Sequence, residues 1–197
     1  MLALMPFLAS LIALVFINEK ISKQNFISMI IAFIGALIMI YASAFSGSLY
    51  GLIMGFISSL GFAAFTVALR SKSDNKKFYI LIYAGIFCAT ISCCLMIINS
   101  QEVYLPFRNI LLSITHGLIV ASGLILFSIG SKHLLSGELT MLSLLEVVGG
   151  IFWAWLPVLG INEIPSTNTI VGGIVICSAI AMNSYSFDKK RLQNLIR

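Results

Sequence analysis

Hydrophobic residues are gathered into long blocks along this chain, and the charged residues are confined to the short segments between them. Seven apolar stretches can be counted between Met1 and Ser186. They span residues 1–17, 26–44, 49–69, 78–98, 109–130, 139–161 and 169–185. A membrane helix needs about 20 predominantly apolar residues, so the pattern predicts an all-α, polytopic membrane helix bundle with seven transmembrane helices.

The composition agrees with this pattern. The chain is 59% hydrophobic and 10% charged, whereas a soluble domain has about 25% charged residues. The first stretch is interpreted as a helix and not as a signal peptide, because no basic residue precedes it and Asn18-Glu19-Lys20 is not a small-residue cleavage site. Its start at Met1 without a polar lead suggests that an N-terminal part is missing.

The basic residues predict the orientation. If the segment 70–77 is cytoplasmic, eleven of the twelve Lys and Arg residues lie inside and Arg108 alone lies outside. We therefore expect a multi-pass protein of the cell inner (plasma) membrane, with its N-terminus outside and its C-terminus in the cytoplasm. This asymmetry accounts for the net charge of +5, so nucleic acid is not expected as a partner, and the basic tail 187–197 is expected to contact anionic lipid head groups.

Glu146 is the most informative residue within the apolar stretches. An ionised carboxylate in a membrane helix costs about 2 to 4 kcal/mol on insertion scales, so Glu146 must be protonated, paired or facing a wet cavity. At helical spacing Ser143, Gly149 or Gly150, and Trp153 share its face, which suggests the lining of a substrate path. The alternative is a protonated Glu146 that hydrogen-bonds a neighbouring helix.

Other polar and small residues receive simpler interpretations. His116 lies near the outer end of the fifth stretch, where it is either a pathway residue or a solvated packing residue. Gly47, Gly51 and Gly55 recur every four residues and form a ridge suited to close helix packing, a role also assigned to Pro6. The four cysteines lie in apolar stretches and imply neither a disulfide nor a metal site.

An internal repeat is visible. Met5-Pro6-Phe7-Leu8-Ala9 leads to Asn18-Glu19-Lys20-Ile21-Ser22 and then to the stretch with Gly35, while Glu146-Val147-Val148-Gly149-Gly150 leads to Asn162-Glu163-Ile164-Pro165-Ser166 and then to the stretch with Gly172. The predicted orientation places Glu19 inside and Glu163 outside, so the two copies have opposite topology. Inverted repeats are typical of secondary transporters.

These motifs, with Leu144-Leu145-Glu146 and Trp153-Ala154-Trp155, resemble the EamA domain of the drug/metabolite transporter superfamily. The resemblance implies ten helices in two inverted five-helix repeats that move small polar metabolites. Against that pattern the chain would hold the fourth to tenth helices: residues 1–44 end the first repeat, 45–186 form the second, and 187–197 are the tail. Two departures are Val147, where the family often has proline, and a longer segment at 156–161.

The expected function is export or exchange of a small polar metabolite by alternating access. Glu146 would bind a proton or a cationic substrate group, with Ser143, Gly150 and Trp153 shaping the cavity. The alternative is a non-transporting scaffold or subunit, or an inactive transporter fragment, and a homodimer is compatible with the glycine ridge. The sequence has no zinc-protease motif, Walker loop or dinucleotide fingerprint, so neither an enzyme nor a cofactor is expected. Glu19 and Glu163 are expected to hold their loops at helix starts.

Overall fold

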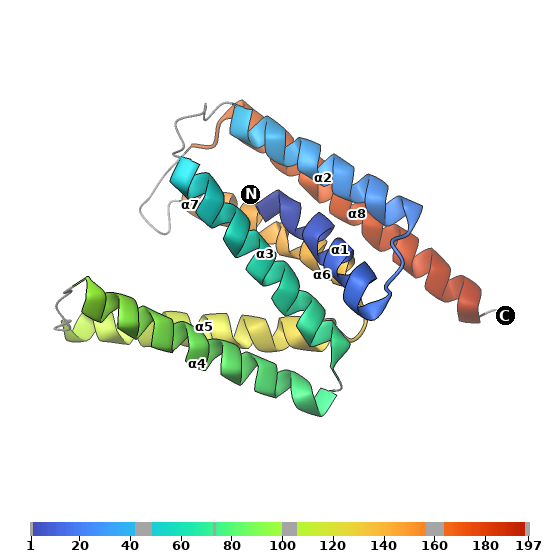
Figure 1. The fold of residues 1–197 in the computed structure, drawn as a ribbon. Coiled ribbons are helices and arrows are strands. Elements are labelled where there is room, and N and C mark those ends of the chain that lie inside the picture. The colour runs from blue at the N-terminus through green and yellow to red at the C-terminus, as the bar shows by residue number, and fades with distance from the viewer. Residues whose placement is uncertain (1, 42–48, 73, 100–105, 157–163, 196–197) are drawn as a thin grey trace. The chain divides into compact units, whose positions relative to one another are not determined.

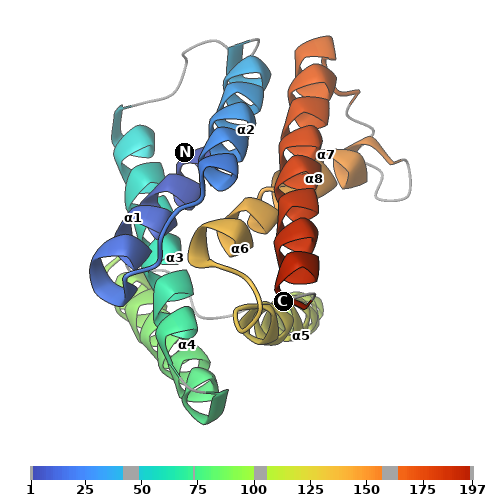
Figure 2. The same cartoon turned by 90° about the vertical axis from the view of Figure 1, so that its right-hand side faces the viewer.

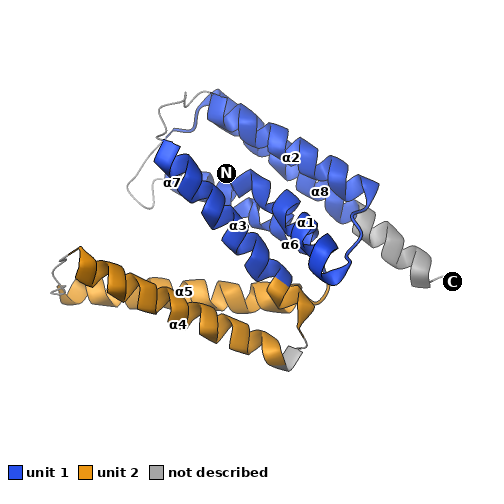
Figure 3. Cartoon of the chain, in the orientation of Figure 1, with its two compact units in different colours: residues 1–67, 134–197 blue, residues 68–133 orange. Residues whose placement is uncertain are grey.

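A computed structural model of the chain describes residues 2–41, 49–72, 74–99, 106–156 and 164–195, and every regular element among them is a helix (Figure 1). The side chains of residues 74–75 and 186–195 are not described. The expected all-α class is confirmed. The chain forms two compact units, residues 1–67 with 134–197 and residues 68–133 (Figure 3).

The helices follow the apolar stretches closely. They are η1 (Leu2–Leu4), α1 (Met5–Ile17), α2 (Lys23–Tyr41), α3 (Leu49–Ser71), α4 (Asp74–Ile98), α5 (Phe107–Gly130), α6 (Ser136–Ser143), α7 (Leu145–Trp155) and α8 (Thr167–Leu195). Among the described residues, six segments are long and apolar enough to cross a membrane, and Leu2–Ile17 is a shorter apolar helix. Six to seven apolar helices therefore suit a membrane helix bundle.

The sixth apolar stretch is not one helix, which corrects the prediction for 139–161. It begins earlier, at Ser136, and is interrupted at Leu144. The Leu144 amide donates to the carbonyl of Met141 at 3.1 Å, three residues back, which tightens the turn. Ser143 Oγ also donates to the carbonyl of Leu139 at 3.3 Å, and such back-bonding bends helices. Residues 157–161 lie outside the described part.

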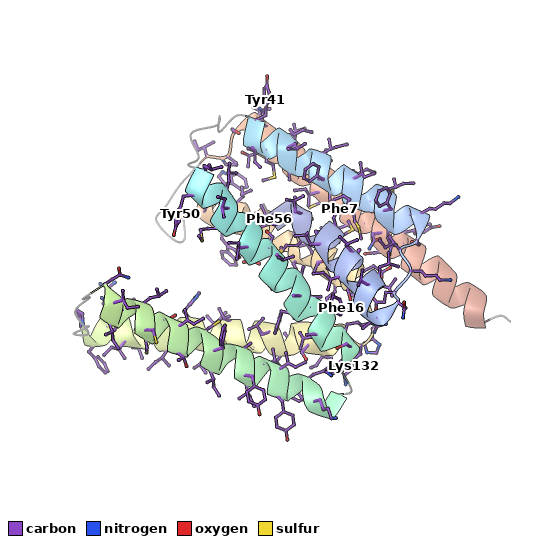
Figure 4. The ribbon with its side chains drawn as sticks, viewed as in Figure 1. Phe7, Phe16, Tyr41, Tyr50, Phe56 and Lys132 are labelled. Carbon is purple, nitrogen blue, oxygen red and sulfur yellow. The ribbon has the colours of Figure 1, made fainter. Side chains whose placement is uncertain are left out.

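In the first unit, α6 lies between α1 and α8 (Figures 1 and 2). The buried core is built by α2, α6 and α8 with Leu144, and consists of Met29, Ala32, Met141, Leu144, Ile176, Ala179 and Ile180. Phe7 joins α1 to α2 through edge-to-face contacts with Phe26 and Phe33, at centroid distances of 6.2 and 6.1 Å. Tyr41 and Tyr50 project from the adjoining ends of α2 and α3 (Figure 4), as is typical of aromatic residues at a membrane interface.

The closest helix approach in this unit lies between α2 and α8. A Cβ built on Gly35 would come to 2.9 Å from the carbonyl oxygen of Gly172, and a Cβ on Gly172 would come to 2.5 Å from that of Gly35. The contact is reciprocal: Gly35 also meets Ile176, four residues beyond Gly172, and Gly172 meets Met39, four residues beyond Gly35. Small residues at both positions therefore let the two backbones touch.

The residues expected to pack helices occupy different settings. Pro6 is fully buried in the first turn of α1. On α3, Gly51 is exposed and Gly55 is half-buried, while Ser59 is buried. Gly47 lies outside the described residues. The close glycine contact at Gly35 and Gly172 thus lies on helices other than the one that carries the predicted ridge.

The second unit is a hairpin of α4 and α5, closed at one end by polar contacts. Lys77 Nζ donates to Ser131 Oγ at 3.0 Å, and Arg70 Nη1 donates to the carbonyls of Ser131 and Lys132 at 3.0 and 2.7 Å. These cations meet the C-terminal end of α5, where the helix dipole favours positive charge. The most apolar 18-residue window of each helix contains no buried residue.

Candidate functional site

A buried polar cluster forms in the first unit where α1, α2 and α6 meet. Its position follows from the end of α1, where Asn18 adopts a left-handed conformation with φ 54° and its amide donates to the carbonyl of Ala13. Asparagine accepts this conformation readily, so the chain turns sharply toward α2. Ser22 Oγ then accepts the amide of Asn25 at 3.2 Å as a helix cap, which directs the Asn25 side chain into the bundle.

Glu138 is the carboxylate at the centre of the cluster. It is 6% exposed, and Asn25 is 4% exposed. Asn25 Nδ2 donates to Glu138 Oε1 at 2.8 Å, and the amide of Leu135 donates to Glu138 Oε2 at 3.1 Å. Asn25 Oδ1 in turn accepts from Ser22 Oγ at 2.8 Å. Both Glu138 oxygens therefore accept hydrogen bonds, one from α2 and one from the start of its own helix.

The balance of energies at Glu138 is close. Hydrogen bonds to charged groups contribute about 1.5–3 kcal/mol each, and an ionised carboxylate in a membrane helix costs about 2–4 kcal/mol on insertion scales. Two such bonds are comparable with that cost. Neither donor carries a charge.

Glu19 contributes a second carboxylate to the same region. Its Oε2 accepts the amide of Ser136, the first residue of α6, at 3.0 Å. The loop between α1 and α2 is therefore tied to the N-terminus of α6, where the helix dipole favours an anion. Glu19 holds a helix start, as expected, but that helix is α6 and not α2. The start of α2 is capped by Ser22.

A small cavity opens beside these groups. Its lining residues are Ser10, Ala13, Glu19, Lys20, Ile21, Asn25, Leu135 and Gly137. Its volume is ≈ 10 Å³, which is room for a single water molecule. The Ser10 hydroxyl donates only weakly, to Met29 Sδ at 3.7 Å. A Cβ at Gly137 would collide with Ser10 Oγ and come to 2.6 Å from Met29 Cε, so the ends of both side chains would have to shift.

Further polar atoms near these helices are buried without a partner among the described residues. They are Ser28 Oγ, Ser136 Oγ and Asn183 Oδ1. An unpaired polar atom inside an apolar bundle is costly, unless water or a ligand satisfies it. This end of the bundle is therefore more polar than a purely packed membrane core would be.

The face predicted around Glu146 is placed differently. Ser143 ends α6 and is half-buried, while Glu146, Gly150 and Trp153 lie on α7 and are exposed. Glu146 is therefore not enclosed by the described residues. The four residues lie on the consecutive helices α6 and α7, and no described neighbour closes a cavity over them.

A larger depression does lie against α7 and α8, but it is apolar. Its volume is ≈ 570 Å³, and Phe152, Trp155, Pro165 and Gly173 are among its lining residues. Trp155 rather than Trp153 lines it. His116 belongs to the other unit, where it lines a depression of ≈ 490 Å³ between α4 and α5 together with residues such as Gly85 and Val120.

Sequence reasoning missed the central pair of the buried cluster. Asn25 and Glu138 each lie one residue outside the predicted stretches 26–44 and 139–161, so both were assigned to loops. A usable signal was present in the polar Ser136-Gly137-Glu138, because Glu138 stands three residues after Leu135, where a carboxylate can reach back to a helix's first amides.

The fold and the cluster together define a multi-pass helical membrane protein with ionisable groups inside its bundle. The chain is similar to two curated relatives, both described as pseudopaline exporter CntI, from Pseudomonas aeruginosa strains PAO1 and UCBPP-PA14. Each is 23% identical over 177 residues, which is 88% of this chain and 60% of the relative. The chain thus spans about 60% of the length of these relatives. The similarity supports a membrane transport protein.

No family model matches the chain, and no solved structure matches it.

Proposed function

We propose that the chain is a secondary transporter of the EamA type that exports or exchanges a small polar metabolite by alternating access. The observation that carries the proposal is the similarity to an exporter, which extends over 88% of this chain. Because pseudopaline is named as the substrate of those relatives, it is the first compound to test. Nothing in the sequence suggests ATP binding, so a proton or substrate gradient would drive the movement.

The reciprocal contact between α2 and α8 supports this proposal. Two inverted copies of one unit are related by a two-fold axis in the membrane plane, and such an axis makes equivalent residues meet each other. Gly35 and Gly172 occupy matching places in the two repeats, and each meets the other's carbonyl. Gln24 Nε2 donates to the carbonyl of Met182 at 3.1 Å, which fits antiparallel helices as opposite topology requires.

The site assignment within this proposal has two parts. Glu146, Ser143, Gly150 and Trp153 on α6 and α7 would face the metabolite, with Glu146 binding a proton or a cationic group. His116 on α5 is a further candidate for the pathway. Exposure of Glu146 on the outside of the described helices is compatible with this role where other helices complete the cavity.

The orientation and setting belong to the same proposal. The N-terminus of this chain would face outward and its C-terminus the cytoplasm of a cell inner membrane, as eleven inward Lys and Arg residues suggest. The bilayer is then the surrounding partner of α4 and α5. A homodimer is the oligomer that we would test first.

The experiment is uptake into proteoliposomes that contain the 197-residue chain. The vesicles are given labelled pseudopaline or a labelled pool of polar metabolites, with and without an imposed pH gradient. We expect gradient-dependent accumulation by wild type and its loss in Glu146→Gln. Accumulation equal to that of empty liposomes, from protein that is monodisperse and helical, would refute transport by this chain.

The competing function is a non-transporting scaffold or subunit, or a transporter fragment. The observation that favours it is that the chain spans about 60% of the relatives' length. A scaffold has no reason to need an ionisable Glu146. Wild type and Glu146→Gln would then behave alike in every assay of membrane assembly, and neither would accumulate metabolite.

A further inference from the structure

The buried carboxylate Glu138 has no role in the site around Glu146. It is 6% exposed, and its two hydrogen-bond donors are the neutral Asn25 amide and the Leu135 backbone amide. Among the described residues no cation is paired with it. Burial of a carboxylate without a cation favours the uptake of a proton or a positive ligand.

We propose that Glu138 is a proton-binding site whose occupancy controls the link between α2 and α6. The inference rests on the proposed function, because a transport cycle gives such a proton its use. In this scheme the two carboxylates have separate roles: Glu138 binds the proton, and Glu146 binds the substrate's cationic group.

The geometry explains how a proton acts on the link. In the ionised form Glu138 Oε1 accepts from Asn25 Nδ2 at 2.8 Å, and Oε2 accepts from the Leu135 amide at 3.1 Å. A proton on either oxygen adds an O–H donor and leaves that oxygen a poorer acceptor for the N–H group that faces it. Protonation therefore weakens one of the two bonds, either the one to α2 or the one that holds the start of α6.

The surrounding groups make the site responsive. Glu19 Oε2 accepts the neighbouring amide of Ser136 at 3.0 Å, so the second carboxylate keeps the start of α6 in place when Glu138 changes state. The water-sized cavity lined by Glu19, Lys20 and Asn25 lies beside both donors to Glu138, since Asn25 and Leu135 are among its lining residues.

The charged groups around α6 can be named. They are Glu19 and Lys20 in the loop after α1, Lys23 at the start of α2, and Glu146 on α7. On α8 the charged residues fall within 188–191, whose side chains are not described. Of the described residues, only Asn25 and Leu135 donate hydrogen bonds to Glu138.

The test is infrared difference spectroscopy of the whole chain in lipid bilayers between neutral and acidic pH. A protonated carboxylic acid gives a carbonyl band that an ionised carboxylate lacks. Each of the seven Asp and Glu residues adds to this band when it is protonated, so we expect one component of the wild-type band to be lost in Glu138→Gln and kept in the matched variant Glu146→Gln. A band unchanged by Glu138→Gln, or lost instead in Glu146→Gln, would overturn the proposal.

A second variant covers misfolding of Glu138→Gln. Asn25→Ala keeps the carboxylate but removes the donor on α2 that bonds Glu138 Oε1, so the Glu138 component of the band should shift in frequency relative to wild type. An unchanged frequency in folded Asn25→Ala would overturn the role of the pair.

Transport measured on the same proteins separates the two hypotheses. Loss of gradient-driven accumulation in Glu138→Gln, together with loss of the band, supports both. If the expected band appears but wild type does not transport, the proposed transport function is refuted and the proposed proton site is supported. If wild type transports but the band is unchanged by Glu138→Gln, the transport function is supported and the proton site is refuted.

Discussion

Replacement of Gly172 by alanine tests the packing of α2 on α8. The added Cβ would lie 2.5 Å from the carbonyl oxygen of Gly35 and 3.0 Å from the amide nitrogen of Met39. Both neighbours are backbone atoms of α2, so no rotation of a side chain relieves the contact. The two helices must move apart instead, and with them the core formed by Met29, Ala32 and Ile176.

The size of the effect can be estimated from two opposing terms. Overpacking of a close contact costs about 1–3 kcal/mol, and the rigid backbone on both sides favours the upper part of that range. Alanine gains about 1 kcal/mol over glycine in helix propensity. We therefore expect Gly172→Ala to lower the free energy of unfolding by about 1–2 kcal/mol.

Gly173 supplies the matched control, because it is the next residue on α8 and its Cβ would meet nothing within 4 Å. Gly173→Ala should leave stability unchanged or raise it by up to about 1 kcal/mol. The assay is unfolding in mixed detergent micelles with increasing sodium dodecyl sulfate, followed by circular dichroism. Equal stability of Gly172→Ala and Gly173→Ala would refute the close approach of the helices.

Three further outcomes follow from other contacts. Gly137→Ala should destabilise the bundle in the same unfolding assay, and Ser10→Gly in the same chain should recover much of the loss by vacating the space for the Cβ; no recovery would contradict the packing at this point. Lys77→Met should raise amide hydrogen exchange at the end of α5 because the bond to Ser131 is lost, whereas the exposed Lys76→Met should not; equal exchange in the two variants would argue against the tie. A green fluorescent protein fused to the C-terminus should fluoresce and an alkaline phosphatase fused there should be inactive; the opposite result would reverse the orientation.

The number and place of the helices could be predicted because membrane burial leaves a strong mark on sequence. Where the structure describes them, all seven stretches are helical, although the sixth is divided at Leu144, since apolar length alone decides whether a segment can cross a bilayer. The break at Leu144 could not be read the same way. At this break the side chains of Thr140 and Ser143 bond back to their own helix, and an apolar stretch with or without a break has the same composition.

The candidate site was harder to predict for a related reason. The sequence predicts a binding role for Glu146 because it stands within an apolar stretch, yet its side chain is exposed. Glu138 and Asn25 stand at stretch boundaries and are buried, because α1 and α2 fold over the start of α6. Hydropathy shows whether a residue lies within an apolar stretch of the sequence. It does not show whether the side chain is buried among the folded helices.

The glycine contact shows the same limit. A ridge of glycines at four-residue spacing on α3 was the stronger sequence signal, but close approach needs a partner surface as well as small residues. Gly35 has its partner in Gly172, 137 positions away in the numbering (172 − 35), and nothing local to either position indicates the pairing. The repeat in the sequence was the only available hint that the two belong together.

The contact between Gly35 and Gly172 is reciprocal. It is therefore equivalent with respect to the two faces of the membrane. In a carrier that alternates between inward-open and outward-open forms, the Gly35–Gly172 crossing would contribute equally to both. Bulk added there should slow or unfold the carrier without biasing which side is open. The bond from Gln24 to the carbonyl of Met182 at 3.1 Å lies toward one end of the same helix pair. Because this bond lies at one end only, its loss would shift the equilibrium between the inward-open and outward-open forms.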